Sequence, residues 1–154
     1  MLKNGILAAC LIALMNSTPV WAMSSGSGSS TAAGLPDFAA GKKAVEAKDY
    51  AAAEKHLMAS VKKLPNHVDS LNLLGYSSRK LGKVDAAFKY YRQALSIDDA
   101  HRPSLNYLGH LFLETGQMDK AKGVLDQLNS ACHFGCDEYD DLKAAVAAGK
   151  SGKY

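Results

Sequence analysis

The sequence predicts an all-α protein built from consecutive helical hairpins. Residues 68–101 align without a gap to residues 102–135 and share ten identical positions. Self-similarity with a period of 34 residues is typical of a repeat architecture. Apolar residues also recur at the i, i+3, i+7 spacing of an amphipathic helix, as at Leu105, Leu108 and Phe112. The length of 154 residues allows one such domain and argues against a second.

The chain begins with the pattern of a secretory signal peptide over residues 1–22. Lys3 precedes an apolar run over residues 6–15, and Val20 and Ala22 offer side chains that fit a signal peptidase site. The run is too short to span a bilayer. We expect cleavage after Ala22, export, a periplasmic location in a cell with an outer membrane, and no membrane span in the mature chain. The alternative is lipidation at Cys10, which follows a sequence similar to a lipoprotein box.

Residues 23–34 are rich in serine and glycine and predict a flexible linker, because such a composition cannot bury enough apolar surface to become ordered. The folded domain is expected at residues 35–148. Residues 149–154, which include the final SGKY, are expected to be a frayed tail.

Three hairpins and one further helix are expected within the domain. The hairpins occupy repeats at 34–67, 68–101 and 102–135, and a helix opened by Asp137 covers the end of the stack, because each repeat buries its face only against its neighbours. The first repeat is degenerate, with Lys48 where the turn glycine is expected. The expected helices span 36–47, 50–63, 67–81, 84–96, 102–115, 118–130 and 137–148.

Four glycines recur at matching places in the second and third repeats. Gly75 and Gly109 lie in the middle of helices, where glycine costs about 1 kcal/mol relative to alanine. This cost indicates that another helix approaches closely at both positions. Gly82 and Gly116 follow the last periodic residue, and glycine there can adopt the left-handed conformation that ends a helix.

This pattern resembles the tetratricopeptide repeat, whose 34-residue motif combines a large apolar residue, Leu-Gly, a turn glycine, and alternating small and aromatic residues. Residues 68–101 supply Leu71, Leu74, Gly75, Gly82, Ala87, Tyr91 and Ala94 at these places. The resemblance extends over residues 34–135. It implies a non-enzymatic module that binds a protein or peptide partner in a concave groove lined by the first helix of each hairpin.

By this resemblance, the groove of the second and third repeats is lined by Asn72, Tyr76, Arg79, Lys80, Asn106, His110, Leu113 and Glu114. Phe38, Lys42 and Val45 of the first repeat would join them. The amides of Asn72 and Asn106 can donate to and accept from an extended peptide. The alternative is that both bridge neighbouring helices inside the fold. We expect Arg79 and Lys80 to form part of a solvated face.

Two cysteines remain after signal cleavage, Cys132 and Cys136, and their short spacing in an exported chain favours a disulfide that pins the last helix to the third repeat. A metal- or redox-responsive function through Cys132, His133 and Cys136 is the alternative. His67 and His101 lie one repeat apart at turns and are expected to be solvated, with a pair of metal ligands as the alternative.

Several classes of function are not supported by the sequence. The formal net charge is +3, with both signs interleaved, which gives no electrostatic footprint for nucleic acid. No phosphate loop, nucleophile elbow or paired zinc-ligand motif is present, so we expect no enzyme, no cofactor and no metal. The prediction is therefore an adaptor or scaffold of the bacterial cell envelope, with its oligomeric state left open.

Overall fold

The computed structural model describes residues 35–133 and 135–151, so the predicted signal peptide and linker lie outside the described residues. The described part forms helices and no strand. The helices are α1 (Pro36–Glu46), α2 (Tyr50–Lys63), α3 (Val68–Lys80), α4 (Val84–Ile97), α5 (Arg102–Glu114), α6 (Met118–Ala131) and α7 (Asp137–Ala148). Each helix begins and ends within one residue of its predicted bounds, and the all-α prediction is confirmed.

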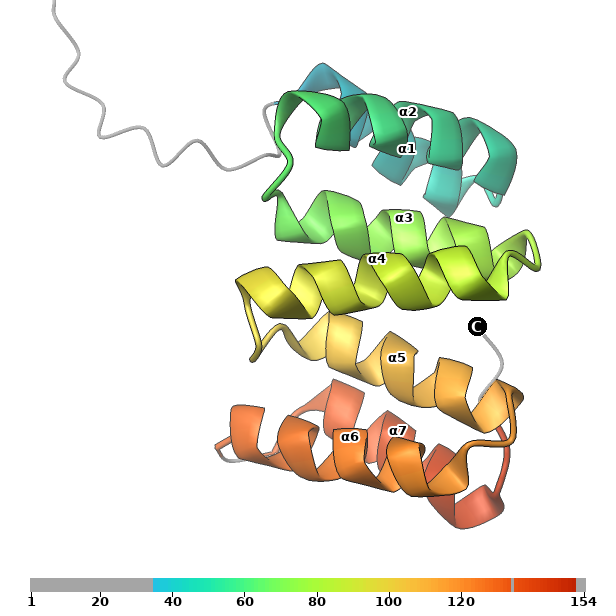
Figure 1. Ribbon diagram of the computed structural model, residues 1–154, viewed down its shortest axis with the longest axis vertical. Coiled ribbons are helices and arrows are strands. Elements are labelled where there is room, and N and C mark those ends of the chain that lie inside the picture. The colour runs from blue at the N-terminus through green and yellow to red at the C-terminus, as the bar shows by residue number, and fades with distance from the viewer. Residues whose placement is uncertain (1–34, 134, 152–154) are drawn as a thin grey trace, which may run out of the picture.

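The helices pair into hairpins that stack along one axis. Figure 1 shows α1 and α2 at one end, α3 and α4 in the middle, and α5, α6 and α7 at the other end. Helix α7 packs against both α5 and α6. It buries Leu142 and Ala145 in the core that these helices share, and thus covers the end of the stack as predicted. Within the described ranges no helix has both the length and the apolarity that a membrane crossing requires.

Close helix packing occurs at the two mid-helix glycines. A Cβ atom added to Gly75 would lie 2.6 Å from Cε1 of Tyr91 in α4. At Gly109 it would lie 2.4 Å from Cδ2 of Leu142 in α7. Both distances are far shorter than a van der Waals contact, so the absence of a side chain is what allows α3 to approach α4 and α5 to approach α7 this closely. The predicted close approach is confirmed.

The turns inside the hairpins are also as predicted. Gly82 and Gly116 adopt the left-handed conformation, with φ of 74° and 72°. Lys48 takes the same place in the first repeat with φ of 59°, which is uncommon for a residue other than glycine. The shared turn geometry at intervals of 34 residues places the first repeat in the same register as the other two.

His67 and His101 are not solvated turn residues, and that prediction is wrong. Their side chains are 14% and 13% exposed. Each Nδ1 accepts a hydrogen bond from a backbone N–H at the start of a helix, from Ser70 at 2.9 Å and from Ser104 at 3.3 Å. Both histidines therefore act as N-caps of α3 and α5. Nε2 of His101 also lies 3.2 Å from Oδ1 of Asp69, which ties neighbouring repeats together.

Candidate functional site: the concave face

The predicted groove residues of α3 and α5 lie next to one another, but several of them bind each other. Asn72 and Asn106 are 5% and 3% exposed. Oδ1 of Asn72 accepts a hydrogen bond from Oγ of Ser104 at 3.1 Å. Nδ2 of Asn106 donates to the carbonyl oxygen of Glu138 and to Oδ2 of Asp141, each at 2.8 Å. Both asparagines thus have the bridging role that was the alternative to peptide contact.

Arg79 of α3 and Glu114 of α5 form a two-pronged ion pair. Nε of Arg79 donates to Oε2 at 2.8 Å and Nη2 donates to Oε1 at 2.6 Å. The arginine side chain is 4% exposed, so its interpretation as part of a solvated face is wrong. The hydrogen bond from Arg79 lowers the pKa of the Glu114 carboxyl below its usual value. Planar bidentate geometry of this kind fixes the spacing of the two helices.

His110 joins α5 to α7 from a buried position. Its side chain has no exposed surface, and Nε2 lies 2.7 Å from Oδ2 of Asp141. Burial lowers the pKa of His110, an effect that the nearby Asp141 carboxylate opposes. We assign the proton of the neutral ring to Nε2 because this atom faces the carboxylate. Nδ1 is then an acceptor, and it lies 3.2 Å from Oγ of Ser151.

Ser151 lies beyond the end of α7 and contacts three predicted groove residues. Its Oγ accepts from Nη2 of Arg79 at 3.0 Å, in addition to its contact with Nδ1 of His110. It also hydrogen-bonds to Glu114, which further lowers the pKa of that carboxyl. The expectation that residues 149–154 are frayed is therefore wrong for Ser151. In the sequence, Gly149 is the local sign that the chain turns there, but it does not indicate this contact.

Three tyrosines form a row across α2, α3 and α5. The ring centroids of Tyr50 and Tyr76 lie 5.9 Å apart, and those of Tyr76 and Tyr107 lie 5.1 Å apart. Nζ of Lys80 lies 5.7 Å from the Tyr76 ring and 6.0 Å from the Tyr50 ring, within the range of a cation–π contact. Burial, followed by a hydrogen bond with Tyr50, raises the pKa of Tyr76 to about 12. The three rings and Lys80 are half-buried, so they keep surface that a partner can contact.

The other predicted groove residues are divided between the core and the surface. Leu113 is 7% exposed and belongs to the core, and Phe38 is 8% exposed with its ring 4.9 Å from that of His67. Val45 is half-buried, whereas Lys42 is exposed on α1.

A pocket of about 330 Å³ lies between α5 and the start of α7. The carboxylates at its wall and the adjacent tyrosine ring suit a basic side chain of a partner. It is lined by Pro103, Asn106, Tyr107, Asp137, Glu138 and Asp141.

The cysteine turn connects α6 to α7. The sulfur atoms of Cys132 and Cys136 lie within bonding distance, and their Cα atoms are 5.7 Å apart, in the range of disulfides. His133 is exposed beside them. Among the described residues, no three or more side chains of the metal-binding types are grouped in a way that could hold an ion.

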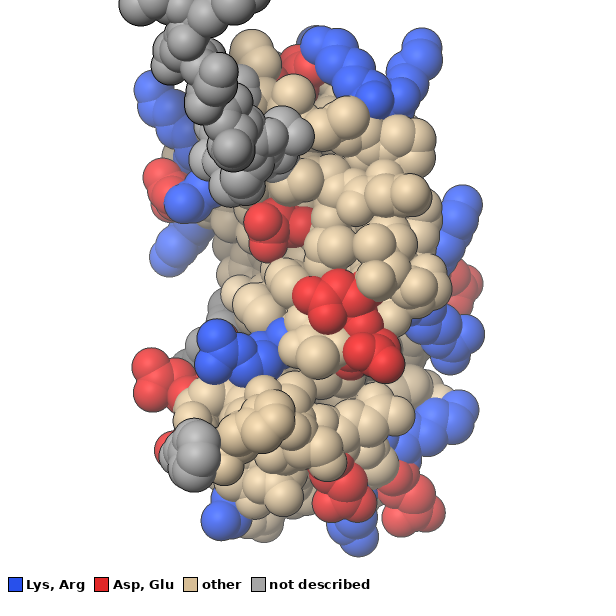
Figure 2. All heavy atoms as spheres, turned by 90° about the vertical axis from the view of Figure 1, so that its left-hand side faces the viewer, with Lys and Arg blue, Asp and Glu red and all other residues tan. Residues whose placement is uncertain are grey.

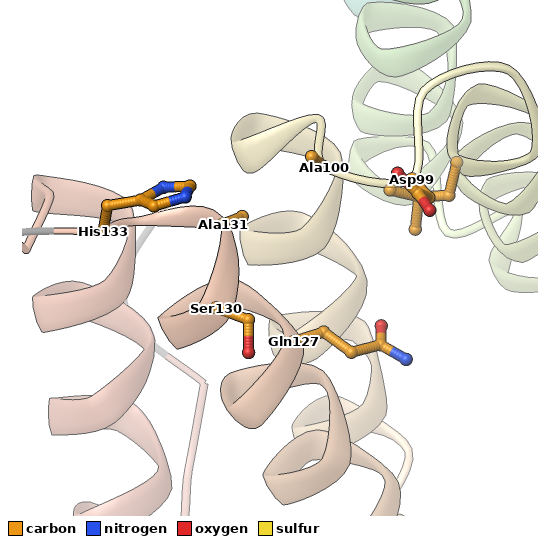
Figure 3. Close-up of a pocket in the computed structure, with 7 residues that line it drawn as sticks. Asp99, Ala100, Gln127, Ser130, Ala131 and His133 are labelled. Atoms are coloured by element: carbon orange, nitrogen blue, oxygen red, sulfur yellow. The ribbon is translucent and has the colours of Figure 1, made fainter.

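A larger pocket of about 570 Å³ lies on the second helices of the hairpins, away from the predicted groove residues. Figure 3 shows Gln127 and Ser130 on α6 facing it, with His133 just beyond that helix and Asp99 on the α4–α5 connection. Figure 2 shows one side of the molecule, where uncharged surface predominates, acidic side chains gather near the middle and most basic side chains lie at the margins.

The repeat geometry agrees with comparisons to known proteins. Residues 78–146 match the family described as Tetratricopeptide repeat. This part of the chain consists of tetratricopeptide repeats. Among curated proteins, no sequence matches it.

Solved structures with the same repeats share its fold at low sequence identity. The type III secretion chaperone SycD of Yersinia enterocolitica, in complex with a peptide of the translocator YopD, is 16% identical with a TM-score of 0.65, and 73% of this chain aligns to 86% of that one. PcrH in complex with the chaperone-binding region of PopD is 18% identical with a TM-score of 0.63, covering 73% of this chain and 84% of that one.

An O-GlcNAc transferase mutant of Thermobaculum terrenum is 18% identical with a TM-score of 0.65. There 73% of this chain corresponds to only 21% of the transferase. The likeness to that enzyme is therefore confined to a small part of it, and all three comparisons concern the tetratricopeptide repeat fold alone.

Proposed function

We propose that this protein binds an extended segment of a partner protein on its concave face. The observation that carries the proposal is the row of Tyr50, Tyr76 and Tyr107 with Lys80 beside it. Half-buried aromatic rings supply large contact areas at low entropic cost, and rigid helices hold them in place before the partner arrives. Two of the structural neighbours are in complex with segments of their partners, which supports a tetratricopeptide repeat module of this size as a peptide receptor.

The proposed role is that of an adaptor in a bacterial cell envelope, and it is not catalytic. The proposal of export rests on the signal peptide pattern in residues 1–22. Mass spectrometry of the protein from an envelope fraction tests it, because cleavage after Ala22 gives a mature chain that begins at Met23. We further propose that the cysteine pair is oxidised there, as is usual for an exported chain.

The contacts Ser151–His110–Asp141 have the residue types of a nucleophilic triad, but their surroundings differ from those of an active site. The imidazole of His110 is buried, so a substrate would have no access to it. The hydroxyl of Ser151 is also hydrogen-bonded to Arg79 and Glu114, so it is engaged within the chain. The three residues therefore support a binding role.

Site-specific photo-crosslinking in the native host tests the proposed function. A benzoylphenylalanine at position 80 lies beside the tyrosine row, and the same amino acid at exposed position 89 on α4 is the matched control. We expect a partner protein to be crosslinked from position 80 and not from position 89, and to be lost when Tyr76→Ala is added to the first variant. Equal crosslinking from both positions would show that the concave face is not the binding surface.

A further inference from the structure

Three of the eight predicted groove residues meet at one hydroxyl group. Arg79 of α3 supplies a charged donor at 3.0 Å from Oγ of Ser151, and His110 of α5 supplies Nδ1 at 3.2 Å. Glu114 of α5 is a further hydrogen-bond partner of the same side chain. The hydroxyl belongs to a residue 37 positions after Glu114 and 72 after Arg79, so the chain returns to the concave face after it has completed the repeats.

The end of α7 directs this return. Gly149 adopts the left-handed conformation with φ of 67° and its N–H donates to the carbonyl oxygen of Val146 at 3.1 Å. The N–H of Lys150 donates to the carbonyl oxygen of Ala145 at 3.2 Å. These bonds close the last turn of the helix and reverse the chain immediately afterwards. Ser151 is thereby placed over α3 and α5, two residues after the glycine.

We infer that residues 149–151 are an internal ligand of the concave face, in which Ser151 fills a hydroxyl-binding site formed by Arg79, His110 and Glu114. A partner segment takes the same site with a serine or threonine and displaces the tail. This inference rests on the proposed function, because it names the side chain that the concave face selects and the segment of the chain that competes for it.

The chemistry of the site selects a hydroxyl. The site offers one cationic donor, one anionic acceptor and one neutral acceptor within a few ångströms. A hydroxyl accepts from Arg79 and donates its proton to Nδ1 of His110 or to Glu114. For a carboxylate, attraction by Arg79 is offset by repulsion from Glu114, and for an ammonium group, attraction by Glu114 is offset by repulsion from Arg79, so the paired charges favour neither ion. An alanine side chain would make none of these bonds.

Competition between the tail and a peptide in trans tests the inference on the full mature chain. The probe is a fluorescent peptide with the sequence of residues 148–154, and its control carries alanine in place of the serine. The chains are wild type, Ser151→Ala, and Ser130→Ala, whose serine is exposed on α6 and bonds only the carbonyl oxygen of Asp126. Fluorescence anisotropy gives each dissociation constant, and circular dichroism checks that the helices are retained.

If the tail is docked about nine-tenths of the time, only about a tenth of wild-type molecules have an open site, and releasing the tail raises the apparent affinity about tenfold. We therefore expect the Ser151→Ala chain to bind the probe about tenfold more tightly than wild type and Ser130→Ala chains. Equal affinity of the Ser151→Ala and wild-type chains overturns the inference, as does equal binding of the alanine peptide.

Photo-crosslinking from position 80 tests the proposed function independently of the internal ligand. A partner crosslinked equally well in the wild-type and Ser151→Ala backgrounds, with no difference in probe affinity, refutes the internal ligand and leaves the peptide-binding function standing. Tight probe binding to the Ser151→Ala chain, without any partner crosslinked from position 80, refutes the proposed function and leaves the hydroxyl site standing.

Discussion

Two glycine-to-alanine substitutions in helix interiors should change stability in opposite directions. At Gly75 a Cβ would lie 2.6, 2.7 and 3.1 Å from three atoms of the Tyr91 ring, which is fully buried and rigid. At Gly123 on α6 nothing lies within 4 Å of the same atom. The backbone is helical at both positions, so the gain in helix propensity is shared and only the packing differs.

The magnitude follows from these contacts. Overpacking a core costs about 1–3 kcal/mol, and three overlaps with a rigid ring place Gly75→Ala at the upper end. The helix propensity of alanine returns about 1 kcal/mol at either site. The net change in the free energy of unfolding is a loss of about 2 kcal/mol for Gly75→Ala and a gain of about 1 kcal/mol for Gly123→Ala. For a domain of this size the midpoint of thermal unfolding moves by roughly 10 °C downward and 5 °C upward.

Urea and thermal unfolding of a chain of residues 23–154, followed by circular dichroism at 222 nm, measures both changes. The slope of the urea transition should be the same in all three proteins, because the surface exposed on unfolding is unchanged. If Gly75→Ala is as stable as wild type, Tyr91 can move without cost, and the explanation of the glycine as a close-approach position is incorrect. A destabilised Gly123→Ala would contradict the propensity argument instead.

Three further predictions concern charge and covalent structure. Burial lowers the folded-state pKa of His110 and of the histidine that caps α3. The stability that these two neutral rings confer is therefore complete above about pH 6.5 and is lost as the pH falls below it. The urea midpoint should be lower at pH 5.5 than at pH 7.5, and this difference should be smaller in His110→Gln. Glu114→Ala leaves Arg79 buried without its carboxylate and should cost about 3 kcal/mol in urea unfolding. Glu54→Ala should cost under about 1 kcal/mol, because the cation that it leaves unpaired, Lys83, is 52% exposed. If the proposed disulfide closes its short loop, Cys136→Ser should lower the free energy of unfolding by about 2 kcal/mol, and reductant should affect only wild type.

The helices and turns could be predicted from the sequence because they depend on local patterns. Apolar periodicity predicted the first and last residue of each helix to within one position. The recurring glycines indicated the turns and the close contacts between helices. The role of His67 and His101 was missed, although each stands three residues before a serine at the start of a helix. A histidine that caps a helix and a solvated histidine look the same in the sequence. They are distinguished only in the structure, by the hydrogen bond from the backbone N–H of Ser70 or Ser104 to the imidazole.

The contacts of the concave face were harder to predict because they join different repeats. Arg79 and Glu114 are 35 residues apart, and Asn72 and Ser104 are 32 apart, so both pairs differ from the repeat period by one or two residues. The repeat alignment placed these side chains on the same face, but it did not show that they would satisfy one another. The position of Ser151 could not be predicted from the repeat alignment, because Ser151 lies outside the repeats.

Under the proposed function, this internal pairing leaves the start of the stack as the binding surface that is available first. In α3 and α5 the polar groove residues Arg79, Glu114 and His110 are engaged within the chain, and Ser151 lies upon them. At the other end α1 carries an exposed Lys42 next to a shallow pocket of about 240 Å³, and the tyrosine row with Lys80 lies between the two ends. Under the proposed function, a partner segment binds first along α1 and the tyrosine row, and it reaches Arg79, His110 and Glu114 only when it displaces Ser151. Binding in this order makes the affinity depend on partner length, because only a segment long enough to reach Arg79 gains the hydroxyl site.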